Sequence, residues 1–474
     1  MTIIERLRAM QEGDVPTHGG RTLAYVYDSG IAEADEIGRT ALSMYASSNG
    51  LDPTAFPSLL AMENDLVDTA ARLLDAPSSA VGTVTSGGTE SVLLAVQAAR
   101  DARPELREPN LVLPTTAHAA FHKAAHYFGV QRRMVDVDPA TMRADPDAMA
   151  AAIDSDTVLV VASAPSYAHG VVDPVSPIAA AAAEAGVRCH VDACIGGWVL
   201  PYLDLPPTGP WTFAVDGVTS ISVDLHKYAY TPKGVSLLLH RDPTLRRPQF
   251  FASADWPGYT MLNATTQSTK SGGPLAAAWA VVQHIGPDAY EDLARTARAG
   301  ILDLVAGIAS IDHVALVCEP DSTLIAIETD GACDVFSIAD AMLDRGWYVQ
   351  PQMSFRGHAP SLHLTVSAAT APHVPDFLSA FDETVTECVA AGPIDVPEEL
   401  AAAAQTIDPA SLDDAAFDGL LQLAGLGGDG TTEMPTRMAP VNALLDAAPP
   451  ALREALLVAY LDRLTRPQTR RDSR

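Results

Sequence analysis

The stretch GVTSISVDLHKYAYTPKGVSLLLH, residues 217–240, decides how the rest of the chain is interpreted. Residues 218–223 are rich in β-branched side chains and alternate apolar with polar residues, and residues 235–239 are largely apolar, which predicts two strands with a polar turn between them. Lys227 lies in this turn, and neighbouring strands that desolvate its ammonium group would lower its pKa. We therefore expect an amine nucleophile able to form a Schiff base, although a lone lysine is more simply a surface residue. The same turn contains Asp224, His226 and Lys233.

Length, charge and cysteine usage limit the class of protein. A chain of 474 residues exceeds the size of a single hydrophobic core, so we expect a large domain and at least one smaller one. The formal net charge of −29 argues against nucleic acid and anionic membranes as partners. Five scattered cysteines argue against a disulfide framework and a cysteine zinc site. With no apolar signal segment or membrane-length apolar run, we expect a cytoplasmic protein.

Strand and helix signals alternate through the first two thirds of the chain. The uninterrupted apolar run 158–162 is typical of a buried parallel strand, and the alanine-rich helix 177–186 leads to another strand, 187–193. These patterns predict an α/β fold with a largely parallel sheet. The expected divisions are an N-terminal arm and helix (1–57), a large domain (58–308), a small α+β domain (309–393), and an acidic helical extension (394–474) with a Gly-rich break at 425–430 and a basic tail from 466.

Two segments are candidates for holding a phosphate. Thr85–Ser91, TSGGTES, places Gly87, Gly88 and Thr89 before a predicted helix, where backbone N–H groups and the helix dipole favour an anion. The segment matches neither GxGxxG nor GxxxxGK[ST], and an ordinary helix cap with a glycine turn is the alternative. The polar loop 265–274 could supply backbone donors across a subunit interface, or be a flexible loop without that role.

Asp192 ends the predicted strand 187–193, and sites in α/β sheets form at the carboxyl ends of strands. A buried aspartate there can keep the pyridine nitrogen of pyridoxal phosphate (PLP) protonated, which makes the ring an electron sink. A cap for the following turn, 194–197, is the equally weighted alternative.

His118, His122 and His126 follow one another at i, i+4 and i+8. This spacing extends about 12 Å along a helix axis, too far for one metal ion, so we expect no metal site there. His118, at the helix start, is expected to have a separate role, whereas the other two are packing or surface residues.

Five phrases in order give the chain a resemblance to a known family: TSGGTES, AHAAFHKAAHYFG, HGVVDPV, HVDACIGGW and GVTSISVDLHKYAYTPKG. Together they resemble the sphingosine-1-phosphate lyase branch of the group II PLP-dependent decarboxylases, from about Gly20 to Ala391. The resemblance implies a fold-type-I, PLP-dependent transferase-like homodimer with shared active sites. In it Lys227 binds the cofactor covalently, Asp192 pairs with the pyridinium nitrogen, and His118 stacks on the ring with Cys194 on the opposite face. Gly87, Gly88, Thr89 and His226 would hold the cofactor phosphate, helped by Gly272 and Gly273 of the other subunit.

The resemblance also bears on the substrate. Tyr27 and Lys233 match residues that help bind a substrate phosphate in the lyases, but the family phrase SNPLHP is SNGLDP here, so that Asp52 replaces a histidine. A carboxylate there would repel a phosphate. The expected activity is carbon–carbon cleavage of an amino alcohol, with or without a phosphate, to an aldehyde and an amine. An L-amino acid decarboxylase using the same residues, and a catalytically silent PLP-fold scaffold, are the alternatives.

Overall fold

The computed structural model describes residues 1–423 and 437–466 and divides the chain into two compact units. The first unit contains residues 1–307, 316–326 and 363–375, and the second contains residues 308–315, 327–362 and the chain from 376 onward. The expected Gly-rich break at 425–430 and nearly all of the basic tail lie outside the described residues. No helix of the described residues is long and apolar enough to cross a membrane.

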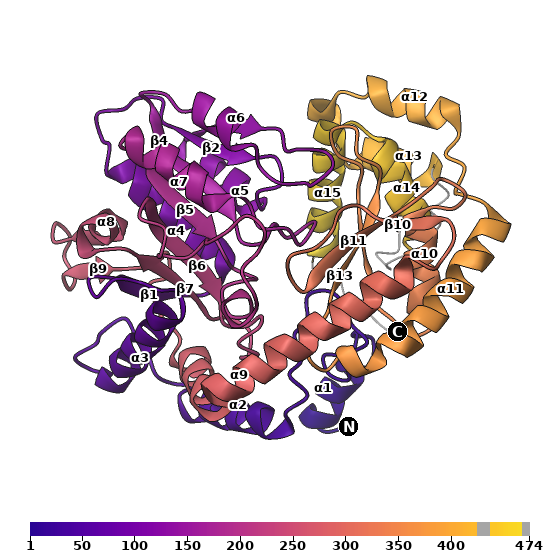
Figure 1. Ribbon diagram of the computed structural model, residues 1–474. Coiled ribbons are helices and arrows are strands. Elements are labelled where there is room, and N and C mark those ends of the chain that lie inside the picture. The colour runs from indigo at the N-terminus through magenta and orange to yellow at the C-terminus, as the bar shows by residue number, and fades with distance from the viewer. Residues whose placement is uncertain (424–436, 467–474) are drawn as a thin grey trace, which may run out of the picture. The chain divides into compact units, whose positions relative to one another are not determined.

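The first unit is built on a seven-stranded sheet (Figure 1). Its order is β1-β7-β6-β5-β4-β2-β3, and only β7 runs antiparallel to its neighbours. The expected α/β class with a largely parallel sheet is confirmed. The strands are β1 (Val81–Thr85), β2 (Asn110–Pro114), β3 (Gln131–Val135), β4 (Thr157–Ser163), β5 (Arg188–Asp192), β6 (Val218–Asp224) and β7 (Ser236–His240).

Both faces of this sheet are covered by helices, which explains the uninterrupted apolar strands. In β4, Val160 and Ala162 belong to a core that includes residues of α7 (Val175–Glu184). Leu159 and Val161 face the other way, in a core with α4 (Gly88–Asp101) and α5 (Ala120–Phe128). Because side chains alternate along a strand, every second residue of β5 and β6 also faces α4 and α5.

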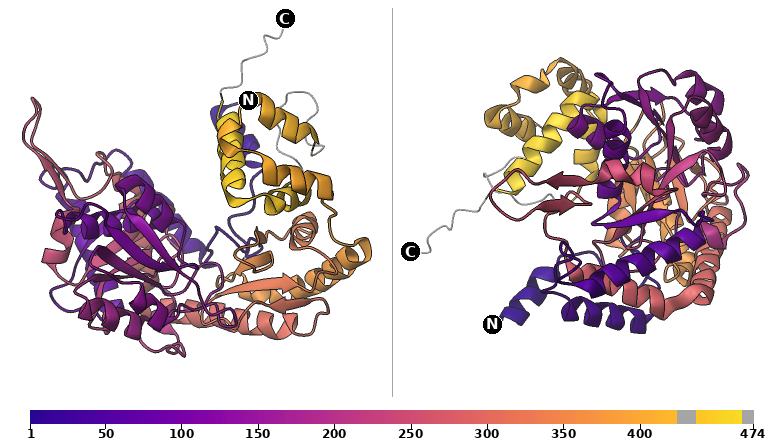
Figure 2. Two further views of the ribbon diagram at one scale, coloured as in Figure 1. Left: turned by 90° about the horizontal axis from the view of Figure 1, so that it is seen from above. Right: turned by 90° about the vertical axis from the view of Figure 1, so that its left-hand side faces the viewer.

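The first unit contains further helices and a short hairpin besides these elements. Its other helices are α1 (Ile3–Gln11), α2 (Ala32–Met44), α3 (Pro57–Leu73), α6 (Pro146–Ala151), α8 (Pro243–Arg246) and α9 (Gly272–Ile308), with 3-10 turns at Leu200–Tyr202, Arg247–Gln249 and Ala371–His373. A short hairpin, β8 (Phe251–Ser253) with β9 (Met261–Asn263), projects from the unit in both views of Figure 2. Helix α9 bends at Gly286, whose φ of 70° interrupts the helix just before Pro287.

One boundary of the expected loop 265–274 is wrong. Helix α9 begins at Gly272, so Gly272 and Gly273 form its first turn rather than the end of a loop. A Cβ atom on Gly272 would lie 2.8 Å from Cβ of Ser48, and one on Gly273 would lie 3.0 Å from the carbonyl oxygen of Leu42. These glycines therefore allow the helix to start in close contact with the N-terminal segment.

A second sheet has four strands in the order β10-β11-β13-β12. The strands are β10 (Val314–Leu316), β11 (Leu324–Thr329), β12 (Gln350–Gln352) and β13 (Ser361–Thr365). The helices in this part of the chain are α10 (Val335–Asp344), α11 (Val374–Ala391), α12 (Glu398–Thr406), α13 (Asp414–Leu423), α14 (Ala439–Ala447) and α15 (Pro450–Leu464). A 3-10 turn lies at Pro409–Ser411. The strand expected at 347–350 is displaced to β12. Trp347 is buried by its edge-on contact with Phe377 of α11, 5.3 Å between ring centroids, and not by strand pairing.

Candidate active site

A cavity of about 510 Å³ lies where three parallel strands of the first unit end. Ser163, Asp192 and Asp224 are the last residues of β4, β5 and β6, and all three line it, together with the N-terminus of α4. Nine of the residues singled out in the sequence also line this cavity: Gly87, Gly88, Thr89, His118, Asp192, Cys194, His226, Lys227 and Lys233. Residues from widely separated segments therefore meet in one site.

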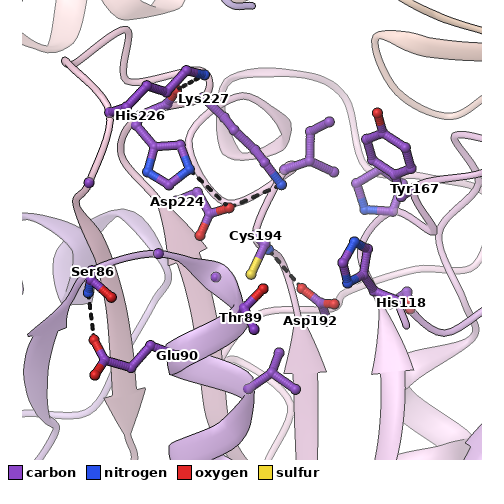
Figure 3. Close-up of a pocket in the computed structure, with 18 residues that line it drawn as sticks. Ser86, Thr89, Glu90, His118, Tyr167, Asp192, Cys194, Asp224, His226 and Lys227 are labelled. Atoms are coloured by element: carbon purple, nitrogen blue, oxygen red, sulfur yellow. Dashed lines mark hydrogen bonds and ion pairs between the residues drawn. The ribbon is translucent and has the colours of Figure 1, made fainter. Parts of the chain in front are cut away.

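Lys227 is held by an ion pair that the sequence did not reveal. Its Nζ lies 3.0 Å from Oδ2 of Asp224, whose side chain is only 3% exposed (Figure 3). The other carboxylate oxygen of Asp224 accepts a hydrogen bond from the Ser236 hydroxyl at 2.6 Å, and Nε2 of His226 lies 3.7 Å from Oδ2. The negative charge of Asp224 is thereby stabilised by the lysine ammonium and the Ser236 hydroxyl, and it fixes the position of that ammonium.

The expected direction of the Lys227 pKa is wrong. Burial does oppose the charge on this lysine, but the Asp224 carboxylate outweighs burial, so that the pKa of Lys227 lies above its ordinary value. The same pairing holds the pKa of Asp224 below its ordinary value, although burial alone would raise it. Within the protein, Lys227 is therefore an ammonium group poised against a carboxylate, and not a free amine.

Asp192 both caps a turn and lines the cavity. Its Oδ1 accepts hydrogen bonds from the N–H of Cys194 at 3.0 Å and from the hydroxyl of Ser222 at 3.4 Å. Figure 3 shows the carboxylate beside His118 in the cavity wall. The two interpretations of this residue are thus compatible, because one oxygen serves the turn while the carboxylate remains available to the cavity.

The start of α4 fits a phosphate group. Its N-cap, Gly87, has no side chain to satisfy the first N–H groups, so the positive end of the helix dipole faces the cavity. A Cβ atom on Gly88 would lie 2.7 Å from Sγ of Cys194 and from Oδ1 of Asp224, so only glycine lets the helix begin here. The helix start, the ammonium of Lys227 and the carboxylate of Asp192 share one cavity, which is what a phosphorylated pyridine aldehyde requires.

Glu90 was missed in the sequence. Its Oε2 accepts the N–H of Ser86 at 2.7 Å, and its Oε1 accepts the N–H of Thr266 at 2.9 Å. This buried carboxylate therefore ties the loop before α4 to the segment that follows the β8–β9 hairpin. Its position in the first turn of the helix was a signal, since acidic residues favour that place, but its partner Thr266 is 176 residues away.

Four of the residues expected in the site do not line this cavity: Tyr27, Asp52, Gly272 and Gly273. Tyr27 is close by, because its ring centroid lies 5.0 Å from Nζ of Lys233. Asp52 caps its own turn by accepting hydrogen bonds from the hydroxyl of Thr54 at 2.6 Å and from its N–H at 2.9 Å, and these two bonds lower the pKa of Asp52. The contribution of the two glycines to a neighbouring subunit stays a prediction.

Lys233 brings a second cation to the cavity. Its Nζ donates to the carbonyl oxygens of Tyr25 at 2.8 Å and His226 at 3.3 Å. Desolvation, together with repulsion from Lys227, lowers the pKa of Lys233 to about 8. Two neutral acceptors hold this ammonium, so its charge remains available to an anion in the cavity.

His118 and His126 lie in different surroundings. His118 precedes α5, where its Nδ1 accepts the N–H of Ala120 at 3.1 Å and its ring meets that of Tyr167 edge-on at 6.1 Å. His126 is exposed beside Tyr127. Within residues 1–423 and 437–466, no group of three or more His, Cys, Asp and Glu side chains is arranged to hold a metal ion.

Comparison with known proteins is consistent with this site. Residues 37–270 match the pyridoxal-dependent decarboxylase conserved domain, and residues 398–463 match the C-terminal putative HTH domain of pyridoxal-dependent enzymes. The sphingosine-1-phosphate lyase of Dictyostelium discoideum is 34% identical over 77% of this chain and 69% of its own length. The structure of a Burkholderia pseudomallei sphingosine-1-phosphate lyase superposes with a TM-score of 0.77 at 32% identity, over 82% of this chain and 90% of that one. A Lactobacillus brevis glutamate decarboxylase, at 22% identity and a TM-score of 0.72 over 81% and 92% of the two chains, shares the fold.

The ion pair predicts the effect of Asp224→Asn on the titration of Lys227. Loss of the carboxylate leaves burial unopposed, so the pKa of Lys227 should fall, and the pH midpoint for covalent attachment of PLP to the cofactor-free protein should drop by about one unit or more. The measurement is the rate at which the visible absorption of attached PLP develops at a series of pH values. Asp52→Asn, at an exposed carboxylate outside the cavity, should leave the midpoint unchanged. An unchanged or higher midpoint in Asp224→Asn would contradict the assignment.

Proposed function

We propose, from the premise that this chain belongs to the sphingosine-1-phosphate lyase family of PLP-dependent enzymes, that it cleaves a phosphorylated long-chain amino alcohol. The chain is a PLP-dependent lyase. The observation that carries the substrate proposal is its 34% identity to a lyase of that name, over more than two thirds of both proteins. The decarboxylase alternative has less support, because the decarboxylase structures compared share at most 22% identity, which indicates the fold alone.

The residues of the cavity can be assigned to parts of this reaction. Bound PLP supplies an aldehyde for the amine and a protonated ring that withdraws electrons from the bond to be broken. Lys227 would hold the cofactor through its side-chain nitrogen, and Asp224 would pair with that nitrogen whenever it carries a proton. Asp192 would hold a proton on the ring nitrogen, His118 would contact the ring, and the start of α4 would hold the cofactor phosphate.

Cleavage of an amino alcohol requires that the carbon–carbon bond between the amine-bearing and hydroxyl-bearing carbons breaks. The hydroxyl loses its proton and its carbon becomes an aldehyde, while the amine-bearing carbon gains a proton. Lys233 supports a phosphate on the substrate, because it is the one cation besides Lys227 among the described residues that line the cavity. Asp52 lies outside the cavity of its own chain, so the expected repulsion does not arise within it.

Incubation with sphingosine 1-phosphate should yield a long-chain aldehyde and phosphoethanolamine in equal amounts, detected by mass spectrometry. Lys227→Ala should abolish the reaction. Lys233→Met should lower kcat/KM for the phosphorylated substrate about 10- to 100-fold, as expected for loss of a charged hydrogen bond, and leave the unphosphorylated amino alcohol nearly unaffected.

Release of carbon dioxide from a panel of L-amino acids, without aldehyde from the amino alcohol, would select the decarboxylase instead. Purified protein that binds no PLP and shows no visible cofactor absorption would select the silent scaffold.

We further propose that the enzyme is a homodimer that buries the β8–β9 hairpin against its partner. Trp256, Tyr259 and Leu262 are 45%, 62% and 63% exposed, and such a cluster of large apolar groups is costly in water. The base of the hairpin is fixed, because the Gln249 amide donates to Thr83 Oγ1 at 3.2 Å and to the Ala264 carbonyl at 2.7 Å. An anchored hairpin with an apolar tip suits a rigid docking element.

Light scattering at micromolar concentration should give the wild-type protein twice the chain mass of 49.8 kDa. The triple variant Trp256→Ser, Tyr259→Ser, Leu262→Ser should approach the mass of one chain and retain PLP poorly, because shared sites would be incomplete. Leu205→Ser, which replaces an exposed leucine outside the hairpin, is the matched control and should remain a dimer. A triple variant that keeps the dimer mass would contradict this proposal.

A cytoplasmic location is also proposed. All five cysteines lie among the described residues and are buried free thiols, as is usual in a reducing compartment. Recovery of the tagged protein from a membrane or secreted fraction would contradict this.

A further inference from the structure

His190 is a buried polar residue that no role described so far explains. It lies on β5 two residues before Asp192, and the register of β5 with β6 sets His190 opposite Ser220 and Asp192 opposite Ser222. All four side chains therefore face the same side of the sheet. The imidazole is fully buried, with the ring of Phe121 edge-on at 5.9 Å.

Both nitrogens of His190 have a serine partner. Nδ1 lies 2.9 Å from Oγ of Ser220, and Nε2 lies 3.1 Å from Oγ of Ser222. Ser222 in turn lies 3.4 Å from Oδ1 of Asp192 and 3.3 Å from Sγ of Cys194. A continuous row of hydrogen bonds thus runs from Ser220 through His190 and Ser222 to the carboxylate at the cavity wall.

The direction of this row follows from counting hydrogens. An ionised carboxylate only accepts, so Ser222 must donate its single hydroxyl hydrogen to Asp192. Ser222 can then only accept from the imidazole, which places the hydrogen of His190 on Nε2. Nδ1 is left as an acceptor for the hydroxyl of Ser220. Burial lowers the pKa of His190 to about 4, despite the nearby Asp192, so the ring is neutral at pH 7 and carries one N–H as this row requires.

We propose that His190 is a positioning residue for the lyase reaction: through Ser222 it directs a hydroxyl donor at Asp192 and so holds that carboxylate in place for the cofactor ring nitrogen. Every hydrogen in the row points toward Asp192, and successive aligned hydrogen bonds strengthen one another. A carboxylate that accepts such a donor is stabilised as the anion, which is the form able to hold a proton on the ring nitrogen.

The other titratable groups around Asp192 do not take the place of the Ser222 hydroxyl as its donor. Burial, reinforced by Asp192 and Asp224, holds the pKa of the Cys194 thiol well above its ordinary value, so it stays protonated. Asp224 is paired with Lys227. His118 uses its Nδ1 to accept a backbone N–H, and it lies at the cavity wall and not within the row.

Ser222→Ala and His190→Phe test the role in the dimeric holoenzyme. Ser222→Ala removes the donor and should lower kcat about 10- to 100-fold with little change in KM, whereas His190→Phe keeps the packing on Phe121 and should cost about tenfold. In both variants the acidic limb of the kcat profile should move to higher pH, because the carboxylate at the cavity wall has lost an oriented hydrogen-bond donor. His190→Gln and Ser222→Thr retain a donor at the same place and should restore most of the loss.

The matched control is His240→Phe, at a buried histidine of β7 that bonds Gln249 and has no contact with Asp192. It should leave the acidic limb where it is. An equal shift in His240→Phe and His190→Phe, or no shift in Ser222→Ala, would overturn the proposal.

A second measurement does not depend on activity. In ¹⁵N-histidine NMR of the cofactor-free wild-type protein, with the resonance assigned by its loss in His190→Gln, Nε2 of His190 should carry the hydrogen and Nδ1 should be unprotonated. A hydrogen on Nδ1 would reverse the row and contradict the role of Ser222 as the donor to Asp192.

Discussion

The ion pair between the buried carboxylate of Asp224 and the partly buried ammonium of Lys227 is the interaction on which the site depends. Two opposite charges lie 3.0 Å apart where little water reaches them, and removing either one would leave the other uncompensated. The hydroxyl of Ser236 donates to the carboxylate, so the lysine is held at one point of the cavity. The pair also explains why this lysine, although it is largely withdrawn from water, carries a charge in the cofactor-free chain.

The sheet supplies the rest of the site through the alternation of side chains along its strands. Three neighbouring parallel strands end in Ser163, Asp192 and Asp224, which therefore point into one cavity. Two residues before Asp192 on the same strand, the same alternation sets His190 beside Ser222, between the cavity and the apolar layer that contains Phe121. The start of α4 can approach this cluster only because Gly88 has no side chain.

The fold and much of the site could be predicted because their signals are local. Apolar runs identify the strands, and polar residues just after them identify the cavity, which brought Lys227 and Asp192 together as expected. Contacts that depend on the conformation of a turn, or that join segments distant in the sequence, could not be predicted. The i to i+3 spacing of Asp224 and Lys227 was visible, but whether the turn closes them into an ion pair depends on its conformation, so the pKa of Lys227 was assigned in the wrong direction. Similarly, the pattern of 265–274 does not say that α9 starts at Gly272, since that start depends on contacts with the distant N-terminal segment.

The central claim is that the amine of Lys227 is the point at which the chain holds its cofactor, and borohydride reduction of the holoenzyme tests it most directly. Reduction followed by proteolysis and mass spectrometry should find the reduced pyridoxyl group on the peptide that contains Lys227, in a yield close to one per chain. The Lys227→Ala variant should carry no such group. Labelling of Lys233 or another lysine in the wild-type protein, with Lys227 unmodified, would contradict the account.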